Sequence, residues 1–116
     1  MNTNRTRRDC PTSEPVMTPL GSSNGQQFMR YADVLTPESK SIPEGATEIQ
    51  VYRVVAAEPA VDVAEAVFVG KYTRNPIQVG YAHADNRKFA TYYARWAGLR
   101  GTVSPWSVPL SMNIAA

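Results

Sequence analysis

The chain has few of the residues on which enzymes and metal proteins depend. Among its 116 residues there is one cysteine, Cys10, and one histidine, His83. A single cysteine excludes an intrachain disulfide framework, and one cysteine with one histidine cannot form a structural zinc site. His83 lies in the sequence Ala-His-Ala-Asp, and no nucleophilic serine motif of the Gly-x-Ser-x-Gly type occurs in the chain. We interpret His83 as a loop residue.

Motifs for metals, phosphate groups and reactive thiols are absent too. The acidic residues Glu58, Asp62 and Glu65 do not have the spacing of a calcium-binding loop, and the chain has no glycine-rich phosphate loop. Cys10 lies in a polar segment, which does not provide the rigid electropositive surroundings of a reactive thiol. We therefore expect no catalytic residue, no metal ion and no cofactor, and a protein that is not an enzyme.

The chain also lacks a strong charge and a long apolar run. Its net charge of +2 comes from three arginines against one aspartate among residues 1–13, so the remainder carries no basic stripe of the kind found in nucleic-acid-binding domains. No stretch approaches the roughly 18 apolar residues of a transmembrane helix. No signal peptide is visible, and no lipoprotein cleavage site precedes Cys10. The sequence predicts no nucleic-acid partner and no membrane span, and it leaves the compartment open.

What the chain does contain is the composition of a turn-rich β fold. It has nine prolines and seven glycines, and apolar and polar residues alternate in short runs between them. The runs that predict strands are 15–20, 26–34, 48–55, 67–72, 77–82 and the two halves of a hairpin over 88–114. Residues 56–66 fit either one or two helical turns or a surface loop. About seven short strands with such connections predict an antiparallel sandwich or barrel. Residues 1–13 are polar and aperiodic, and they predict a disordered tail before one domain over 14–116.

The hairpin over 88–114 has the clearest pattern. Two rows of side chains alternate in its first half, namely Ala90, Tyr92, Ala94 and Trp96 in one row and Thr91, Tyr93 and Arg95 in the other. This period of two predicts a strand with a buried face and a wetter face. Gly98 and Gly101 suit the reversal that follows. Pro109 precedes a second alternating run and predicts an edge strand or a bulge there.

The same hairpin carries a family resemblance. Tyr92-Tyr-Ala-Arg-Trp-Ala, then Gly101 and Ser104-Pro-Trp-Ser-Val-Pro109, resemble the last two strands of fibronectin type III domains, particularly those of bacterial proteins. That family has a Tyr-x-Val-Arg-Val-x-Ala strand, a glycine turn and a Ser-x-Pro final strand. The resemblance implies an all-β, seven-stranded antiparallel sandwich of immunoglobulin-like topology. It also implies that Tyr92 is a tyrosine-corner residue whose hydroxyl bonds to nearby backbone. The usual tryptophan of the second strand is missing, and Phe28 or Tyr31 is the expected substitute.

A second resemblance concerns the direction of Trp106. Trp106-Ser107 resembles one unit of the Trp-Ser repeat of cytokine receptors, in which tryptophans of the last strand lie between arginines of the strand before. On this basis Arg95 is predicted to lie over Trp106. Alternation counted back from Ile114 would instead place Trp106 in the core, so the contact requires a register break near Pro109.

The fibronectin type III resemblance implies a non-catalytic interaction or spacer module. The candidate binding face contains Tyr52, Tyr93, Arg95 and Trp106, because aromatic and arginine residues dominate binding hot spots. The same residues could instead brace the sheet through cross-strand contacts, as we expect Tyr92 and Trp96 to do inside the core. Two alternatives stay open. One is a structural protein that self-associates through its sheet face or edges, in a surface or phage-type assembly. The other is a carbohydrate-binding module in which aromatic rings stack on sugars.

Overall fold

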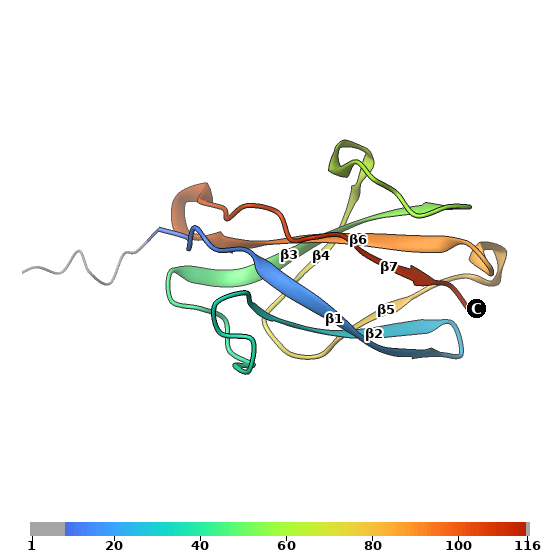
Figure 1. Ribbon diagram of the computed structural model, residues 1–116, viewed down its shortest axis with the longest axis horizontal. Helices are drawn as coiled ribbons and strands as arrows, with labels where there is room; N and C mark the ends of the chain where they lie inside the picture. The colour runs from blue at the N-terminus through green and yellow to red at the C-terminus, as the bar shows by residue number, and fades with distance from the viewer. Residues whose placement is uncertain (1–8, 116) are drawn as a thin grey trace, which may run out of the picture.

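The computed structural model describes residues 9–115, which contain seven β-strands and no α-helix (Figure 1). The strands are β1 (Pro15–Ser23), β2 (Gln26–Asp33), β3 (Ala46–Ala56), β4 (Val67–Tyr72), β5 (Ile77–Gly80), β6 (Phe89–Gly98) and β7 (Leu110–Asn113). Short 3₁₀ turns lie between them at η2 (Val63–Glu65), η3 (His83–Asp85) and η4 (Leu99–Gly101). The all-β prediction is confirmed, and each predicted strand overlaps an observed one. No helix in this range is long and apolar enough to span a membrane.

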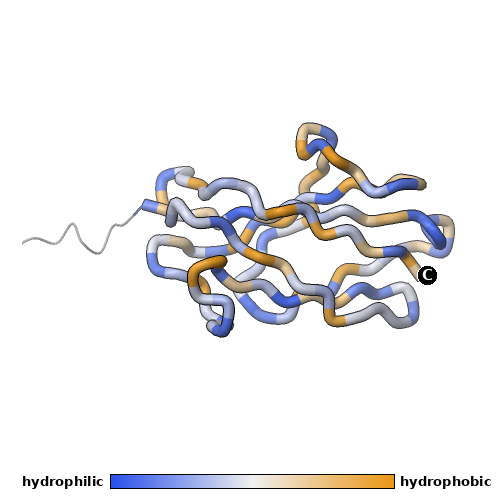
Figure 2. The backbone as a smooth tube through the Cα atoms, viewed as in Figure 1, coloured by the Kyte–Doolittle hydropathy of each residue, from blue (hydrophilic) through white to orange (hydrophobic). Residues whose placement is uncertain are grey.

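The strands form two antiparallel sheets that pack as two layers. One sheet has the order β1-β2-β5, and the other has the order β4-β3-β6-β7. In Figure 1 the long strands β3 and β6 run side by side along the molecule, with β1 and β2 in the layer beneath them. Hydrophobic and hydrophilic residues alternate along many of the strands in Figure 2, as expected when one face of each sheet is buried.

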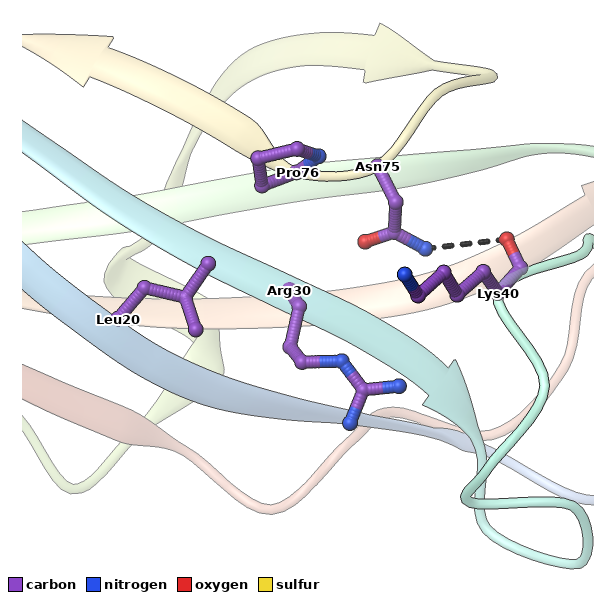
Figure 3. A pocket seen from close by; sticks show the side chains of 5 residues that line it. All are labelled: Leu20, Arg30, Lys40, Asn75 and Pro76. Carbon is purple, nitrogen blue, oxygen red and sulfur yellow. Dashed lines mark hydrogen bonds between the residues drawn. The ribbon is translucent and has the colours of Figure 1, made fainter.

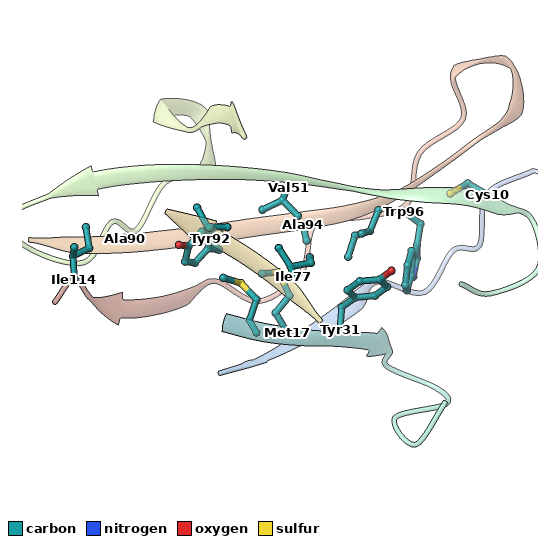
Figure 4. Close-up of a cluster of buried hydrophobic side chains, with 13 residues drawn as sticks. Cys10, Met17, Tyr31, Val51, Ile77, Ala90, Tyr92, Ala94, Trp96 and Ile114 are labelled. Atoms are coloured by element: carbon teal, nitrogen blue, oxygen red, sulfur yellow. The ribbon is translucent and has the colours of Figure 1, made fainter. Parts of the chain in front are cut away.

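The core lies between the two sheets, where Figure 4 shows side chains from both layers in contact. The predicted inward row of β6 is confirmed, because Ala90, Tyr92, Ala94 and Trp96 are all fully buried. Tyr31 of β2 packs edge-on against Trp96, with ring centroids 5.8 Å apart. Of the two residues expected to fill this position in the core, Tyr31 is buried and Phe28 is only half-buried.

The other row of β6 is less exposed than its pattern predicts. Thr91 and Tyr93 are only 0% and 3% exposed, whereas Arg95 is half-buried. The segment 57–66 between β3 and β4 covers this part of the face, and its Ala60 N–H donates to Thr91 Oγ1 at 2.9 Å. The prediction of a wetter face is therefore wrong at Thr91 and Tyr93, because a loop distant in sequence shields them.

The N-terminal boundary of the domain also differs from the prediction. Cys10 is buried, and its N–H donates to Thr102 Oγ1 at 3.3 Å. Ser13 Oγ donates to the buried carboxylate of Asp33, at 2.8 and 2.9 Å from its two oxygens. Burial raises the pKa of the Cys10 thiol, although a hydrogen bond with the backbone of Ser104 opposes that shift. Residues 10–13 thus belong to the folded domain, and the part of the predicted tail over 1–8 lies outside the described residues.

Candidate functional site

A row of aromatic and arginine side chains crosses the outer face of the four-stranded sheet. It contains Phe68 of β4, Tyr52 of β3, Arg95 of β6 and Trp106 of the segment before β7. The Tyr52 ring centroid lies 5.3 Å from that of Phe68 and 5.1 Å from that of Trp106, and both pairs are T-shaped. We call these four residues the aromatic–arginine row. Because its contacts link three strands and the segment before β7, the row holds the rings in fixed relative orientations.

Arg95 contacts two of the rings in the row. The carbon of its guanidinium group is 4.5 Å from the Trp106 ring centroid and 5.7 Å from that of Tyr52. Its Nε donates to Gln50 Oε1 at 3.0 Å, which fixes the guanidinium group over the rings. A cation–π contact of this kind contributes about 0.5–2 kcal/mol. The predicted contact between Arg95 and Trp106 is confirmed.

Trp106 points outward because the segment before β7 does not keep strand alternation. Ser104 N–H donates to the Trp96 carbonyl at 3.0 Å, and Ser107 N–H donates to the Ala94 carbonyl at 2.7 Å. The two serine hydroxyls accept in return from the N–H groups of Trp96 (2.8 Å) and Ala94 (2.9 Å). Serines three residues apart therefore pair with β6 residues two apart. This mismatch breaks the register before β7, as the predicted contact required, and it releases Trp106 from the core face.

Tyr93 does not belong to the exposed surface, although the sequence placed it there. It lies opposite Tyr52 in the β3–β6 ladder but is covered by the segment 57–66. Burial raises the pKa of Tyr93, and the carboxylates of Asp62 and Glu65 raise it further. Its hydroxyl makes no hydrogen bond within residues 9–115. The surface is thus formed by Tyr52, Arg95 and Trp106, with Phe68 in place of Tyr93.

Phe68 is the member of the row that the sequence did not single out. A strand over 67–72 was predicted, but its alternation did not show which residues lie beside Tyr52. Phe68 pairs with Tyr52 because a bulge at Val69 shifts the β3–β4 register, so that Val51 lies opposite Gly70 and Tyr52 opposite Phe68. The one feature of the sequence that could have indicated Phe68 is the presence of a phenylalanine within the predicted strand 67–72.

Tyr92 and Trp96 hold the two sheets together through polar contacts inside the core. The Tyr92 hydroxyl contacts the Tyr81 hydroxyl and donates to Gln27 Oε1 at 2.6 Å. Gln27 Nε2 donates in turn to the Asn113 carbonyl at 3.0 Å. The contacts found for Tyr92 are therefore to side chains, which differs from the backbone bond implied by a tyrosine corner. Trp96 Nε1 donates to Asp33 Oδ1 at 2.8 Å.

A separate hollow of about 230 Å³ lies beside β1 and β2, lined by Leu20, Arg30, Lys40, Asn75 and Pro76 (Figure 3). The amide of Asn75 is already engaged, because it bonds to the backbone of Tyr31 and of Lys40. Arg30 reaches the Pro37 carbonyl at 3.3 Å. The lining of the hollow therefore consists of the cations Arg30 and Lys40 and the apolar residues Leu20 and Pro76, together with an Asn75 amide that is already hydrogen-bonded.

The outer face of the four-stranded sheet presents three aromatic rings and one guanidinium group. Arg95 and the three rings can contact a partner, and no group of three potential metal ligands is close enough together to hold a metal ion within residues 9–115. Comparison with known proteins adds no relative: no family model matches the sequence, and no curated protein matches it.

Proposed function

We propose that the protein is a non-catalytic binding domain of the fibronectin type III type, which contacts a protein partner through the aromatic–arginine row. The strand order supports the fold assignment. With β1 to β7 lettered A, B, C, C′, E, F and G, the sheets are A-B-E and C′-C-F-G. This resembles the order of fibronectin type III domains, whereas constant-type immunoglobulin domains have the fourth strand in the other sheet, as A-B-E-D.

The observation that carries the binding role is the preorganisation of the row. Its rings are fixed by T-shaped contacts, and Arg95 is fixed by Gln50 and by the ring faces. Side chains that are already ordered lose little entropy on binding, and aromatic and arginine residues are the usual anchors of protein interfaces. Exposed valines flank both ends of the row in sequence, Val67 beside Phe68 and Val108 near Trp106.

The geometry favours a protein partner over a carbohydrate. A sugar ring stacks on an open aromatic face, but the Arg95 guanidinium group lies over the Trp106 ring and the rings stand edge-on to one another. An apolar edge with a central cation instead suits the side chains and backbone carbonyls of a polypeptide.

The test is selection of a random peptide library displayed on phage against the immobilised protein. Peptides selected on the wild type should bind Phe68→Ala and Arg95→Ala about 30-fold more weakly, as expected for anchors worth 2 kcal/mol or more. Leu35→Ala changes an exposed apolar residue outside the row and should bind as the wild type does. Equal binding by all variants would contradict the proposal. So would a glycan-array signal that Trp106→Ala abolishes in the absence of any selected peptide.

A further inference from the structure

The hollow beside β1 and β2 lies on the outer face of the three-stranded sheet, whereas the aromatic–arginine row lies on the other sheet (Figure 3). Met29 and Tyr31 of β2 are buried in the core, so Arg30 between them points to the opposite face. Lys40 reaches the hollow from the connection between β2 and β3, and Pro76 comes directly before β5. Parts of the chain that are distant in sequence thus meet around the hollow.

Two cations line this hollow without a counterion among residues 9–115. The Arg30 guanidinium group donates one long hydrogen bond, 3.3 Å to the Pro37 carbonyl, which leaves most of its N–H groups without an acceptor in that range. Lys40 Nζ makes no ion pair or hydrogen bond there. Like charges that share a hollow repel each other, and an anion between them would be attracted by both. The electrostatics of the hollow therefore favour an anion.

The rest of the lining is apolar. Leu20 is 54% exposed and is the extra residue of a β-bulge, because the ladder with β2 passes from Pro19 to Gly21. In Figure 3 the Lys40 side chain extends toward Arg30 from the side opposite Leu20. A hydrated inorganic ion gains nothing from an apolar wall, because it has no apolar surface to bury. The ligand should therefore carry an apolar group beside its negative charge.

Asn75 fixes the rim of the hollow before any ligand binds. Its amide pairs with the backbone N–H and carbonyl of Tyr31, and it also donates to the Lys40 carbonyl at 3.1 Å. These bonds tie the connection that carries Lys40 to the strand that carries Arg30. A site that is already ordered loses less conformational entropy on binding.

We propose that the hollow binds a small carboxylate with an apolar group, about the size of a leucine residue. A cavity of about 150 Å³ holds benzene, and pockets for drug-sized ligands begin at about 300 Å³. The hollow, at about 230 Å³, lies between these sizes. The carboxylate lies between Arg30 and Lys40, and the apolar group lies against Leu20 and Pro76. A carboxylate also has less charge to desolvate beside an apolar wall than a doubly charged phosphate.

The test is a titration of the isotope-labelled protein with 4-methylpentanoate, followed by the chemical shifts of its amide signals. We expect a dissociation constant in the millimolar range, as is usual for a ligand of this size, and saturable shifts at Leu20, Arg30 and Lys40. 4-Methylpentanamide lacks the charge and acetate lacks the apolar group, so each should bind at least about tenfold more weakly. The absence of saturable shifts, or equal binding of the amide, would overturn the site.

Variants separate the two halves of the hollow. Arg30→Gln and Lys40→Gln should each raise the dissociation constant about fivefold, since each removes one partner of the carboxylate. Leu20→Asn keeps both charges and should lower the preference for 4-methylpentanoate over acetate. Arg74→Gln removes an exposed cation that does not line the hollow, and it should bind as the wild type does. Equal weakening by Arg74→Gln would reveal a general attraction of anions and would contradict a defined site.

The same chemistry occurs in a free organic acid and in the last residue of a polypeptide. A short peptide that ends in leucine, compared with 4-methylpentanoate, distinguishes these two sources. If the peptide binds more tightly and its C-terminal amide does not bind, the ligand of the hollow is the end of a polypeptide. If the peptide binds no more tightly, the ligand is a free acid. Both outcomes support the site.

Carboxylate binding at the hollow does not depend on the proposed binding function, because the hollow and the aromatic–arginine row lie on different sheets. Trp106→Ala should bind 4-methylpentanoate as the wild type does. Lys40→Gln should in turn bind peptides selected on the row as the wild type does. Failure of one function would therefore leave the other intact and measurable.

Discussion

The side-chain amide of Asn75 pairs with the backbone of Tyr31 as a strand residue would. Asn75 Oδ1 accepts from the Tyr31 N–H at 2.9 Å, and Asn75 Nδ2 donates to the Tyr31 carbonyl at 2.9 Å. The β2–β5 register, with Met29 opposite Ile77, places position 75 opposite Tyr31. Pro76 has no N–H to offer a ladder. The side chain of Asn75 thus extends the sheet by one pair before β5 begins.

Replacing Asn75 by aspartate should therefore destabilise the fold. Asn75→Asp keeps the acceptor for the Tyr31 N–H but loses the donor, and it sets a carboxylate against the carbonyls of Tyr31 and Lys40. We expect the free energy of unfolding to fall by about 1–3 kcal/mol, measured by urea denaturation. Arg74→Ala changes the exposed neighbour and should stay within about 0.5 kcal/mol of the wild type. An aspartate variant as stable as the wild type would show that this pairing contributes nothing.

We predict that the hydrogen bond donated by Trp96 stabilises the buried carboxylate of Asp33. Its carboxylate accepts from Trp96 Nε1 at 2.8 Å, from Ser13 Oγ, and from the Leu35 N–H at 3.1 Å. Trp96→Phe removes one donor from a buried charge and should cost about 2–3 kcal/mol, since hydrogen bonds to charged groups are the stronger ones. A double-mutant cycle with Asp33→Asn measures the coupling by denaturation. Additive effects of the two substitutions would contradict the dependence.

Tyr92 should make the protein sensitive to alkaline pH. Burial, followed by the hydrogen bond with Tyr81, raises the pKa of Tyr92 well above its ordinary value. The folded chain keeps this proton where the unfolded chain, with a tyrosine pKa of about 10, releases it. The contribution of Tyr92 to the free energy of unfolding is therefore complete below about pH 10 and decreases as the pH rises beyond it.

Urea denaturation at a series of alkaline pH values checks the Tyr92 prediction. Above about pH 10, each tyrosine whose pKa is raised in the folded chain adds up to about 1.4 kcal/mol per pH unit to the decrease in the free energy of unfolding. Tyr92→Phe should be less stable at neutral pH, because Gln27 Oε1 loses its donor, and should show a shallower alkaline decline. Burial also raises the pKa of Tyr31 and Tyr72, so some decline should persist. An unchanged slope in the variant would refute the assignment to Tyr92.

The strands and the inward row of β6 could be predicted because period-two alternation reports directly on the two faces of a strand. Ala90 to Trp96 show it clearly, since each inward position is small or aromatic. The contact of Arg95 with Trp106 came from the resemblance rather than from alternation, which pointed to the core. It became visible only because the Trp-Ser pair implied a break in register.

The burial of Tyr93 and the role of Phe68 could not be predicted in this way. Alternation within β6 does not reveal that the segment 57–66 folds over Tyr93, since that depends on a contact of Ala60 with Thr91. The position of Phe68 depends on the bulge at Val69, which belongs to a pair of strands and not to one. Cys10 was assigned to the tail because a short polar segment has no periodicity, although Thr102 fixes it to the domain.

The hydroxyls of Ser104 and Ser107 should control the direction of Trp106. Each accepts from a buried N–H of β6, that of Trp96 or that of Ala94, which would otherwise lack a partner. Ser107→Ala should cost about 1–3 kcal/mol and accelerate hydrogen exchange at the Ala94 amide. Because the segment then loses one of its two attachments, Trp106 should leave Arg95 and the near-UV circular dichroism should weaken. Ser111→Ala removes a different hydroxyl, bonded to Thr91 Oγ1, and should leave the Ala94 amide protected. Unchanged exchange at Ala94 in Ser107→Ala would show that the backbone bond to the Ala94 carbonyl alone sets the register.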